Sequence, residues 1–318
     1  MKQNKQFWDL IDGICIINLD HRTDRWQKLR AQLSHIPQEK IHRISAVWGK
    51  NLPDFGKGCY FQGCTKDESL FWAGRAGCLL SHRRCIEYAK EHNWEKVLIL
   101  EDDATFHDTL ETEIGTLLQE TIEIVPTWHL FFLGSTPYFP LASPIKQIEI
   151  EKGTITTARI MGPLCAHCYI VHQSAYNDML RDLPTKQNVW KWQATHLSYD
   201  SWIANEFGRT KKHVILGCYP NLCSQGLFYS DIENHDIQHG IGALGGESWP
   251  VTFVDAATFH GCFRQPKFIF KKWMKLAAHA ALGIYYRFCG YRKFSVSIES
   301  AGYLGALKAA LQVLRQRQ

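Results

Sequence analysis

The sequence lacks several features that would place it in a membrane or outside the cell. No stretch of about 18 apolar residues occurs, so no transmembrane helix is predicted. Residues 1–13 are charged and lack the apolar core of a signal peptide, which predicts a cytoplasmic protein. The eleven cysteines are expected to be reduced, because thiols of cytoplasmic proteins do not usually form disulfides. A structural zinc site is not favoured, because Cys165 and Cys168 have no second pair at zinc-knuckle spacing. Without repeats or low-complexity linkers, the chain is expected to form one large domain, with or without an appendage.

Acidic residues are also missing from one part of the chain, between Asp255 and Glu299. The basic residues of this stretch are Arg264, Lys267, Lys271, Lys272, Lys275, Arg287, Arg292 and Lys293. Apolar residues recur among them at helical spacing, which predicts a basic amphipathic helical tail over residues 256–318. We expect this tail to contact an anionic membrane surface, the alternative being an ordinary helix packed on the domain. Nucleic acid is not an expected partner, because the basic block is confined to an apolar-rich tail.

The hydrophobic pattern before the tail alternates between strands and helices. Strands are predicted at residues 14–19, 42–47, 97–100, 128–133, 165–171 and 214–218. Helices are predicted at residues 25–33, 75–92, 108–124, 174–180 and 200–207, and residues 48–72 are predicted to be a loop. This order indicates an α/β fold whose sheet is mainly parallel, with flanking helices.

Three consecutive acids follow the predicted strand at residues 97–100. These are Glu101, Asp102 and Asp103. Ligands of open α/β sheets bind outside the carboxyl ends of the strands, and adjacent carboxylates repel one another unless a cation neutralises them. Oxygen ligands select Mg²⁺ or Mn²⁺, which could neutralise a diphosphate leaving group. A solvated loop after a strand is the alternative interpretation.

Two further segments carry candidate binding residues. Arg22 and Arg25 follow the first predicted strand and lie one helical turn apart, so both could face one anion such as a nucleotide diphosphate. The alternative interpretation is a helix start with two exposed arginines. Gly74 and Gly77 are predicted to open a helix, where backbone can approach a ligand closely, and His82 follows one turn later. A histidine on an apolar helix face is more often a core residue.

Together these segments resemble glycosyltransferase family 25, the bacterial lipooligosaccharide galactosyl- and glucosyltransferases. The resemblance covers about residues 12–232, and its motifs are residues 16–25, 77–82 and 98–104. It implies a GT-A-type fold, a Rossmann-like sheet that binds a nucleotide sugar, for residues 1–255. It also implies an inverting reaction with a UDP-sugar donor. Arg75 stands where the family usually has Glu, which puts the sugar and acceptor specificity in doubt.

The expected roles follow from the motifs and the resemblance. Asp103 is the main predicted metal ligand, Asp102 the second, and Glu101 a supporting one. The residues expected to bind the donor are Asn18, Leu19, Arg22, Arg25, Arg75, Gly77, Ser81, His82 and Asp102.

An inverting transfer needs a base that takes the proton of the acceptor hydroxyl. The resemblance places a later acid at Asp200, which we predict to be this base. A helix N-cap is an equally good interpretation of Asp200, because Asp is favoured there. Asp231, in a motif near the end of the domain, is the alternative base.

The predicted function is a Mn²⁺- or Mg²⁺-dependent transfer of a hexose from a UDP-sugar to a lipooligosaccharide or lipopolysaccharide acceptor. Galactose is favoured over glucose from family frequency alone. The tail and a lipid-linked acceptor together suggest a peripheral protein on the cytoplasmic face of the inner membrane. A metal-dependent phosphoesterase and a non-catalytic nucleotide-sugar-binding protein are the alternatives.

Overall fold

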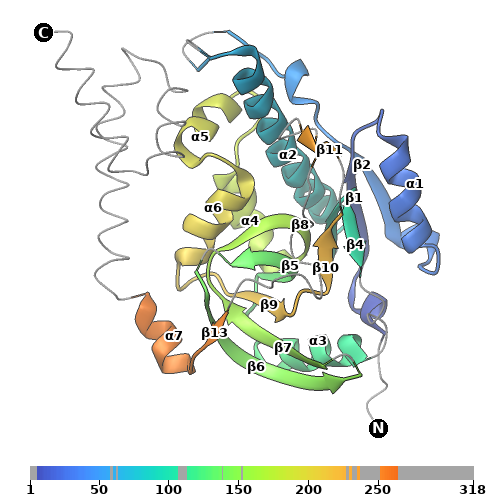
Figure 1. The fold of residues 1–318 in the computed structure, drawn as a ribbon, viewed down its shortest axis with the longest axis vertical. Helices are drawn as coiled ribbons and strands as arrows, with labels where there is room; N and C mark the ends of the chain where they lie inside the picture. The colour runs from blue at the N-terminus through green and yellow to red at the C-terminus, as the bar shows by residue number, and fades with distance from the viewer. Residues whose placement is uncertain are drawn as a thin grey trace, which may run out of the picture.

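The computed structural model describes residues 6–57, 60–61, 64–106, 113–137, 139–151, 153–226, 229–230, 235–236 and 251–263. Its centre is a nine-stranded mixed sheet with the order β13-β6-β7-β9-β5-β8-β3-β1-β2 (Figure 1). The first strands in sequence, β1 (Gly13–Asn18), β2 (Ile41–Ser45) and β3 (Lys96–Glu101), pair in parallel, with β1 in the middle. All six residues of β1 are buried, which is why its sequence is a continuous apolar run.

Beyond β3, the sheet contains antiparallel as well as parallel strand pairs. The remaining long strands are β5 (Leu130–Pro137), β6 (Leu141–Ile150), β7 (Gly153–Ile160), β8 (Pro163–His172) and β9 (Ile215–Tyr219). β8 runs antiparallel between β3 and β5, and β7 runs antiparallel to β6 and β9, whereas β5 and β9 are parallel. Short connections such as the one between β6 and β7 can join only antiparallel neighbours. The predicted parallel order therefore holds for β1 to β3, and the antiparallel pairings lie beyond them.

Short strands complete the described chain. β4 (Ala104–Phe106) pairs with β10 (Cys223–Gln225), and β11 (Tyr229–Ser230) pairs with β12 (His235–Asp236), both antiparallel. β13 (Thr252–Phe253) pairs with β6 at the edge of the main sheet. β4 follows β3 directly, so its pairing with β10 brings a distant segment next to the three acids.

Most helices lie near their predicted positions, but one begins earlier than predicted and another, at Val189–His196, was not predicted. The helices are α1 (Thr23–Gln32), α2 (Lys66–Glu91), α3 (Glu113–Ile124), α4 (Gln173–Asp182), α5 (Val189–His196), α6 (Tyr199–Asn205) and α7 (Ala256–Cys262). α2 begins at Lys66, so the predicted loop at residues 48–72 was wrong at its end. Thr65 accepts a hydrogen bond from the backbone of Glu68, whose side chain bonds back to Thr65. This capping box starts the helix well before its glycines.

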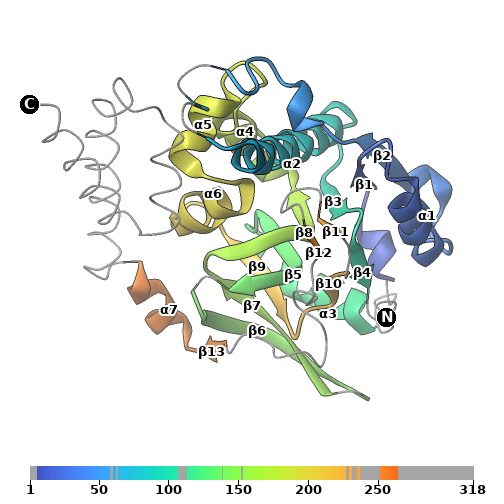
Figure 2. The same ribbon diagram turned by 45° about the horizontal axis from the view of Figure 1, so that its top comes forward.

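Two hydrophobic cores lie on opposite faces of the sheet. In β3, Val97 and Ile99 belong to the core that also contains side chains of α2, α4, α5 and α6. Leu98 and Leu100 belong to the other core, together with side chains of α1 and α3. Figures 1 and 2 show α2, α4, α5 and α6 grouped on one side, with α3 on the opposite side. Because side chains alternate along a strand, Glu101 continues toward α2 and the next residue toward α1.

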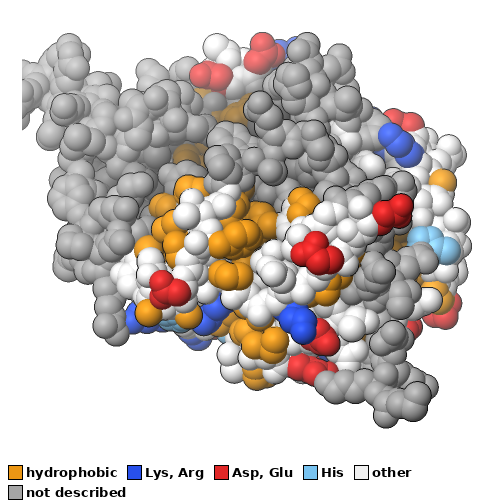
Figure 3. Space-filling model, turned by 60° about the horizontal axis from the view of Figure 1, so that its bottom comes forward, with side chains coloured by type: hydrophobic (Ala, Val, Ile, Leu, Met, Phe, Trp, Pro, Cys, Tyr) orange, Lys and Arg blue, Asp and Glu red, His pale blue; other side chains and the backbone are white. Residues whose placement is uncertain are grey.

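The predicted amphipathic tail lies almost wholly outside the described residues, which end at residue 263. Its first turns form α7, which Asp255 caps by accepting a hydrogen bond from the backbone of Thr258. None of the described helices combines the length and apolar composition that crossing a bilayer requires. On the face drawn in Figure 3, apolar side chains gather near the middle, with acidic and basic ones interspersed. Membrane contact therefore stays a prediction about the tail.

Candidate active site at the carboxyl ends of β1 and β3

Asn18 joins the ends of three parallel strands. It is the last residue of β1, and its side chain is buried. Its Nδ2 donates to Oδ2 of Asp102 at 2.7 Å and to the carbonyl of Arg22 at 2.9 Å. Its Oδ1 accepts from Nε and Nη2 of Arg43 on β2, at 2.9 and 2.7 Å. An amide can donate and accept at the same time. The side chain of Asn18 therefore links Arg43 of β2 to Asp102, which follows β3.

Arg25 and Asp102 form a buried ion pair on the α1 side of the sheet. Nη1 of Arg25 lies 2.8 Å from Oδ1 of Asp102 and 3.8 Å from Oδ2 of Asp103. Burial raises the pKa of Asp102, and the Arg25 charge acts against this shift. Arg22 instead pairs with the exposed Asp24 at 3.0 Å. The two arginines were expected to face one anion, but the structure directs Arg25 inward to the acids.

Glu101 faces the other side of the sheet and meets α2. Its Oε1 lies 3.1 Å from Nε2 of His82 and accepts a longer contact, 3.8 Å, from Sγ of Cys78. Nδ1 of His82 is 3.0 Å from the hydroxyl of Tyr169, which is 2.7 Å from the hydroxyl of Tyr199. Burial acts to raise the pKa of Glu101, but the hydrogen bond with His82 holds it below its usual value. His82 therefore supports a charged carboxylate from inside the core.

Asp103 is the acid whose charge is least compensated. Its Oδ2 accepts a 2.9 Å hydrogen bond from Nε2 of Gln225. Its Oδ1 is buried and has no hydrogen-bond partner among the described residues. Burial, together with the charges of Glu101 and Asp102, raises the pKa of Asp103 to about 7. A buried carboxylate oxygen without a hydrogen-bond partner is a suitable ligand for a divalent cation, whose charge would neutralise that of Asp103.

The three acids do not converge on one point. Among the described residues, the group of three whose ligand atoms all lie within 4.8 Å of one another is Cys78, His82 and Glu101. Both oxygens of Asp102 are already bonded, to Asn18 and Arg25. Of the predicted metal ligands, Asp103 thus offers the free oxygen, and the other two have different protein partners.

The glycines of α2 lie inside the helix rather than at its start. Gly77 lies well inside the helix, and a Cβ there would approach the carbonyl oxygen of Val47 to 2.3 Å. Ser81 accepts from the backbone N–H of Val47 at 2.8 Å and donates to the carbonyl of Gly77 at 2.7 Å. The expectation that these glycines open a helix was therefore wrong. Gly77 lets α2 pack closely against the loop after β2, the strand that carries Arg43.

Part of the chain, including the strands that carry Asn18 and the three acids, matches a known protein family. Residues 11–133 match glycosyltransferase family 25, described as an LPS biosynthesis protein. The predicted resemblance is confirmed over this stretch, which we call the family 25 segment.

The curated relatives match over a similar share of the chain. They include procollagen galactosyltransferase 1-B of Xenopus laevis, 30% identical over 129 residues, and its form 1-A, 27% identical over 136 residues. Each match covers 39% of this chain and 21% of the relative. The chain thus spans about a fifth of the length of these relatives.

Asp200 reaches the site from outside the family 25 segment. It lies in the first turn of α6, where its Oδ1 accepts from the backbone N–H of Ser201 at 2.8 Å and from the hydroxyl of Ser198 at 2.5 Å. Its Oδ2 accepts a long 3.4 Å contact from the backbone N–H of Cys165. Burial first, and then the charges of Glu101 and Asp200, raise the pKa of Cys78. Ser198 is the N-cap of α6, so the N-cap interpretation of Asp200 was wrong, although Asp200 does accept a backbone hydrogen bond in the first turn. Its role as the base stays a prediction, and Asp231 lies outside the described residues.

The remaining predicted donor residues lie at the edge of this site. Leu19 follows β1, and its carbonyl accepts from the backbone N–H of Arg22 at 2.9 Å. The guanidinium of Arg75 lies over the rings of Phe71 and Trp72, 4.1 and 5.5 Å from their centroids. Arg75 therefore lies against aromatic neighbours on its own helix.

Sequence reasoning gave no individual role to three residues that support the site. Arg43 bonds to Asn18, Gln225 to Asp103, and Tyr169 to His82. Tyr169 lies opposite Ile99 in the antiparallel pairing of β8 with β3, which a parallel prediction does not bring together. Gln225 reaches Asp103 only because β10 pairs with β4. No local motif marks Gln225. Tyr169 lies in residues 166–171, which are similar to a strand that lines the sugar site in family 25, and Arg43 could have been noticed near the end of a predicted strand.

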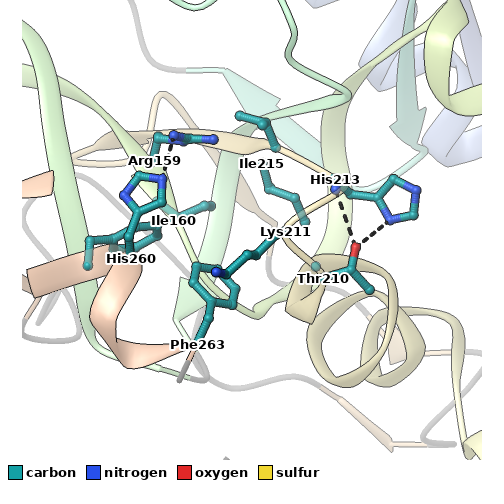
Figure 4. A pocket seen from close by; sticks show the side chains of 11 residues that line it. Arg159, Ile160, Thr210, Lys211, His213, Ile215, His260 and Phe263 are labelled. Carbon is teal, nitrogen blue, oxygen red and sulfur yellow. Dashed lines mark hydrogen bonds between the residues drawn. The ribbon is translucent and has the colours of Figure 1, made fainter. Parts of the chain in front are cut away.

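A hollow of about 60 Å³ lies elsewhere, between β7, β9 and α7. Figure 4 shows the contact of Arg159 with His260 on one side of it and that of Thr210 with His213 on the other. Apolar residues such as Ile160 complete its lining. The hollow contains none of the predicted site residues, so it does not mark the site at the ends of β1 and β3.

Proposed function

We propose that this protein is a glycosyltransferase with a GT-A-type fold that transfers a hexose from a UDP-sugar with inversion. The observation that carries the proposal is the buried Oδ1 of Asp103, without a partner among the described residues, at the carboxyl end of a parallel strand in the family 25 segment. Ligands of α/β sheets bind at such strand ends. The donor is expected to contact Asn18, Arg22 and the loop after β1.

The proposed metal is Mn²⁺ or Mg²⁺, and Asp103 would hold it through its Oδ1. When bound, such an ion supplies positive charge for the diphosphate leaving group. Asp102 remains with Arg25 and Asn18, which fix the backbone of the turn that carries Asp103. Glu101 supports the same turn from the α2 side through His82.

Asp200 is the proposed base for the acceptor hydroxyl. Its Oδ1 is occupied by Ser198 and Ser201, while Oδ2 accepts only the 3.4 Å contact from Cys165. Oδ2 is thus the oxygen available to take a proton as the hydroxyl attacks the anomeric carbon. Asp231 is kept as the alternative base.

The sugar and the acceptor are the less constrained parts of the proposal. Galactose is favoured because the curated relatives are named galactosyltransferases. A lipopolysaccharide or lipooligosaccharide acceptor is favoured because the matching family is described as an LPS biosynthesis protein. The basic tail would bring the enzyme to such a lipid-linked acceptor on the cytoplasmic face of the inner membrane. Deleting residues 264–318 should release the protein from anionic vesicles and spare transfer to a soluble sugar.

A screen of UDP-sugars tests the function. Purified protein is incubated with each donor and with trial oligosaccharide acceptors, with and without Mn²⁺ and with a chelator. We expect acceptor-dependent release of UDP, strongest with UDP-galactose and lost with the chelator. Acceptor-independent cleavage of every donor would instead indicate a phosphoesterase, and binding without turnover a non-catalytic protein.

Two substitutions test the proposed roles of Asp103 as metal ligand and Asp200 as base. Asp103→Asn should lower transfer at least about 100-fold and remove its dependence on Mn²⁺, because the ion loses its main ligand. Asp200→Asn keeps an oxygen that accepts the backbone hydrogen bond of Ser201, so it should retain donor binding and lose transfer. Asp182→Asn, on the exposed end of α4, is the matched control. Undiminished, chelator-insensitive transfer by Asp103→Asn would show that the metal assignment is wrong.

A further inference from the structure

Cys78, His82 and Glu101 bring three different metal-binding groups to one point. Cys78 and His82 lie four positions apart on α2, so both face the end of β3, where Glu101 leaves the sheet on the same side. Nε2 of His82 is 3.1 Å from Oε1 of Glu101, and Sγ of Cys78 is 3.8 Å from the same oxygen. All three ligand atoms lie within 4.8 Å of one another.

These separations are close to those around a tetrahedral ion. Zinc lies about 2.3 Å from sulfur and about 2.0–2.2 Å from nitrogen or oxygen, so its ligand atoms are roughly 3.3–3.7 Å apart. The two distances to Glu101 Oε1 bracket this range, and small side-chain rotations would suffice to reach it. Three protein ligands leave a fourth position for water or for a substrate group.

The surroundings of His82 orient it as a ligand. Its ring is fully buried and stacks on the ring of Tyr199, with centroids 4.4 Å apart. Nδ1 lies 3.0 Å from the hydroxyl of Tyr169, which can accept its proton in a hydrogen bond. Histidine ligands commonly hold their second nitrogen in this way. Without an ion, Nε2 carries the proton that it donates to Glu101; with an ion bound, the proton would reside on Nδ1 and be donated to Tyr169, which frees the lone pair of Nε2 for the ion. Glu101 and Cys78 are partly exposed, so an ion can enter from their side.

We propose that Cys78, His82 and Glu101 form a binding site for a thiolate-preferring divalent ion such as Zn²⁺. A thiolate and an imidazole select zinc over Mg²⁺ and Mn²⁺, which prefer oxygen ligands. When the ion binds, the thiol releases its proton to solvent, and the thiolate and carboxylate offset the two charges of the ion. The site is separate from the hard ion proposed at Asp103 and does not depend on the proposed function.

Cobalt binding to metal-stripped, full-length protein tests the site. Co²⁺ bound by a thiolate gives a sulfur-to-metal charge-transfer band in the near ultraviolet, which oxygen and nitrogen ligands do not give. We expect one equivalent of Co²⁺ to produce this band and one equivalent of Zn²⁺ to abolish it. A chromophoric chelator in competition then gives the zinc affinity.

The variants separate this site from other thiols and from the proposed hard-ion site. Cys78→Ser should remove the cobalt band, and both Cys78→Ser and His82→Gln should weaken zinc binding at least about 100-fold. Cys64→Ser, a partly exposed cysteine before α2, and Asp103→Asn should keep the band and the affinity. Circular dichroism shows whether each variant is folded. If Cys78→Ser fails to fold, the wild-type band and His82→Gln decide.

A wild-type protein without the cobalt band, or with a band that survives in Cys78→Ser, would overturn the proposal. Either result would leave the three residues as a hydrogen-bonded support for Glu101. Sugar transfer is not the readout, so a failure of the proposed function and a failure of this site are distinguishable.

Discussion

The family 25 segment and the part of the chain that follows it contribute to the site in different ways. In the segment, polar groups come directly after buried parallel strands, so Asn18, Asp102 and Asp103 meet because their strands are neighbours. In the later part, single residues such as Asp200 and Gln225 reach the same place through antiparallel pairing and a helix start. The family 25 segment thus provides the connected polar groups at the ends of β1 and β3. The later part of the chain adds single residues that contact this region.

The largest effect is expected when the segment loses its buried ion pair. Arg25→Met leaves Asp102 as a buried carboxylate with only Asn18 as a side-chain partner, which should cost about 3–5 kcal/mol of the free energy of unfolding. Urea denaturation at neutral pH measures it. Arg22→Gln is the control, because its partner Asp24 is exposed and the change should be below about 0.5 kcal/mol. Equal losses in both variants would contradict the division of roles between the two arginines.

A glycine from each part gives the next comparison. Gly77→Ala places a Cβ 2.3 Å from the backbone carbonyl of Val47, so the helix must move, at a cost of about 2–3 kcal/mol. Gly261→Ala in α7 meets no atom within 4 Å and should stabilise the protein by about 0.5 kcal/mol. Thermal unfolding of the two variants beside the wild type measures both. A Gly77→Ala variant as stable as the wild type would show that α2 does not depend on this close approach.

The uncompensated charge of Asp103 predicts a pH effect of intermediate size. Its pKa is about 7 in the folded protein and 3.8 in the free side chain. The contribution of Asp103 to stability is therefore fully present below about pH 4 and is lost as the pH rises through 7. Asp103→Asn removes this loss and should be more stable than the wild type at pH 8 by on the order of 2 kcal/mol. The advantage should shrink toward pH 5. Urea denaturation at both pH values, with chelator present, measures the free energy of unfolding of the variant and the wild type. A difference between them that does not depend on pH would refute the prediction.

The smallest effect concerns a contact between the two parts. Gln225→Ala removes the hydrogen bond to Oδ2 of Asp103, at a cost of about 1 kcal/mol. Because that bond lowers the pKa of Asp103, its loss should raise the pKa further. The pH at which stability falls should therefore shift upward relative to the wild type. Gln193→Ala, whose amide bonds to the carbonyl of Trp72 away from the acids, should leave this pH unchanged.

The sequence was informative wherever a function coincided with a local pattern. The strands before Asn18 and Glu101 are continuous apolar runs, so their ends, and the acids there, could be predicted. The directions of those acids could not, because alternation assigns Glu101 and Asp102 to opposite faces only once the helices on each face are known. The contacts of Tyr169 and Gln225 depend on antiparallel pairings between distant segments, which no local spacing encodes.

The alternation along β3 has a consequence for any change in the length of this strand. Deleting or inserting one residue between Val97 and Leu100 would exchange the two faces, so that the carboxylate now beside His82 would turn toward Arg25, and its neighbour toward α2. The three acids would be unchanged in sequence, yet Glu101 and Asp102 would meet the wrong partners. When this acidic triplet is transferred to another sheet, the sequence alone is therefore not enough. The preceding strand must also have the length that directs Glu101 and Asp102 to the correct faces of the sheet.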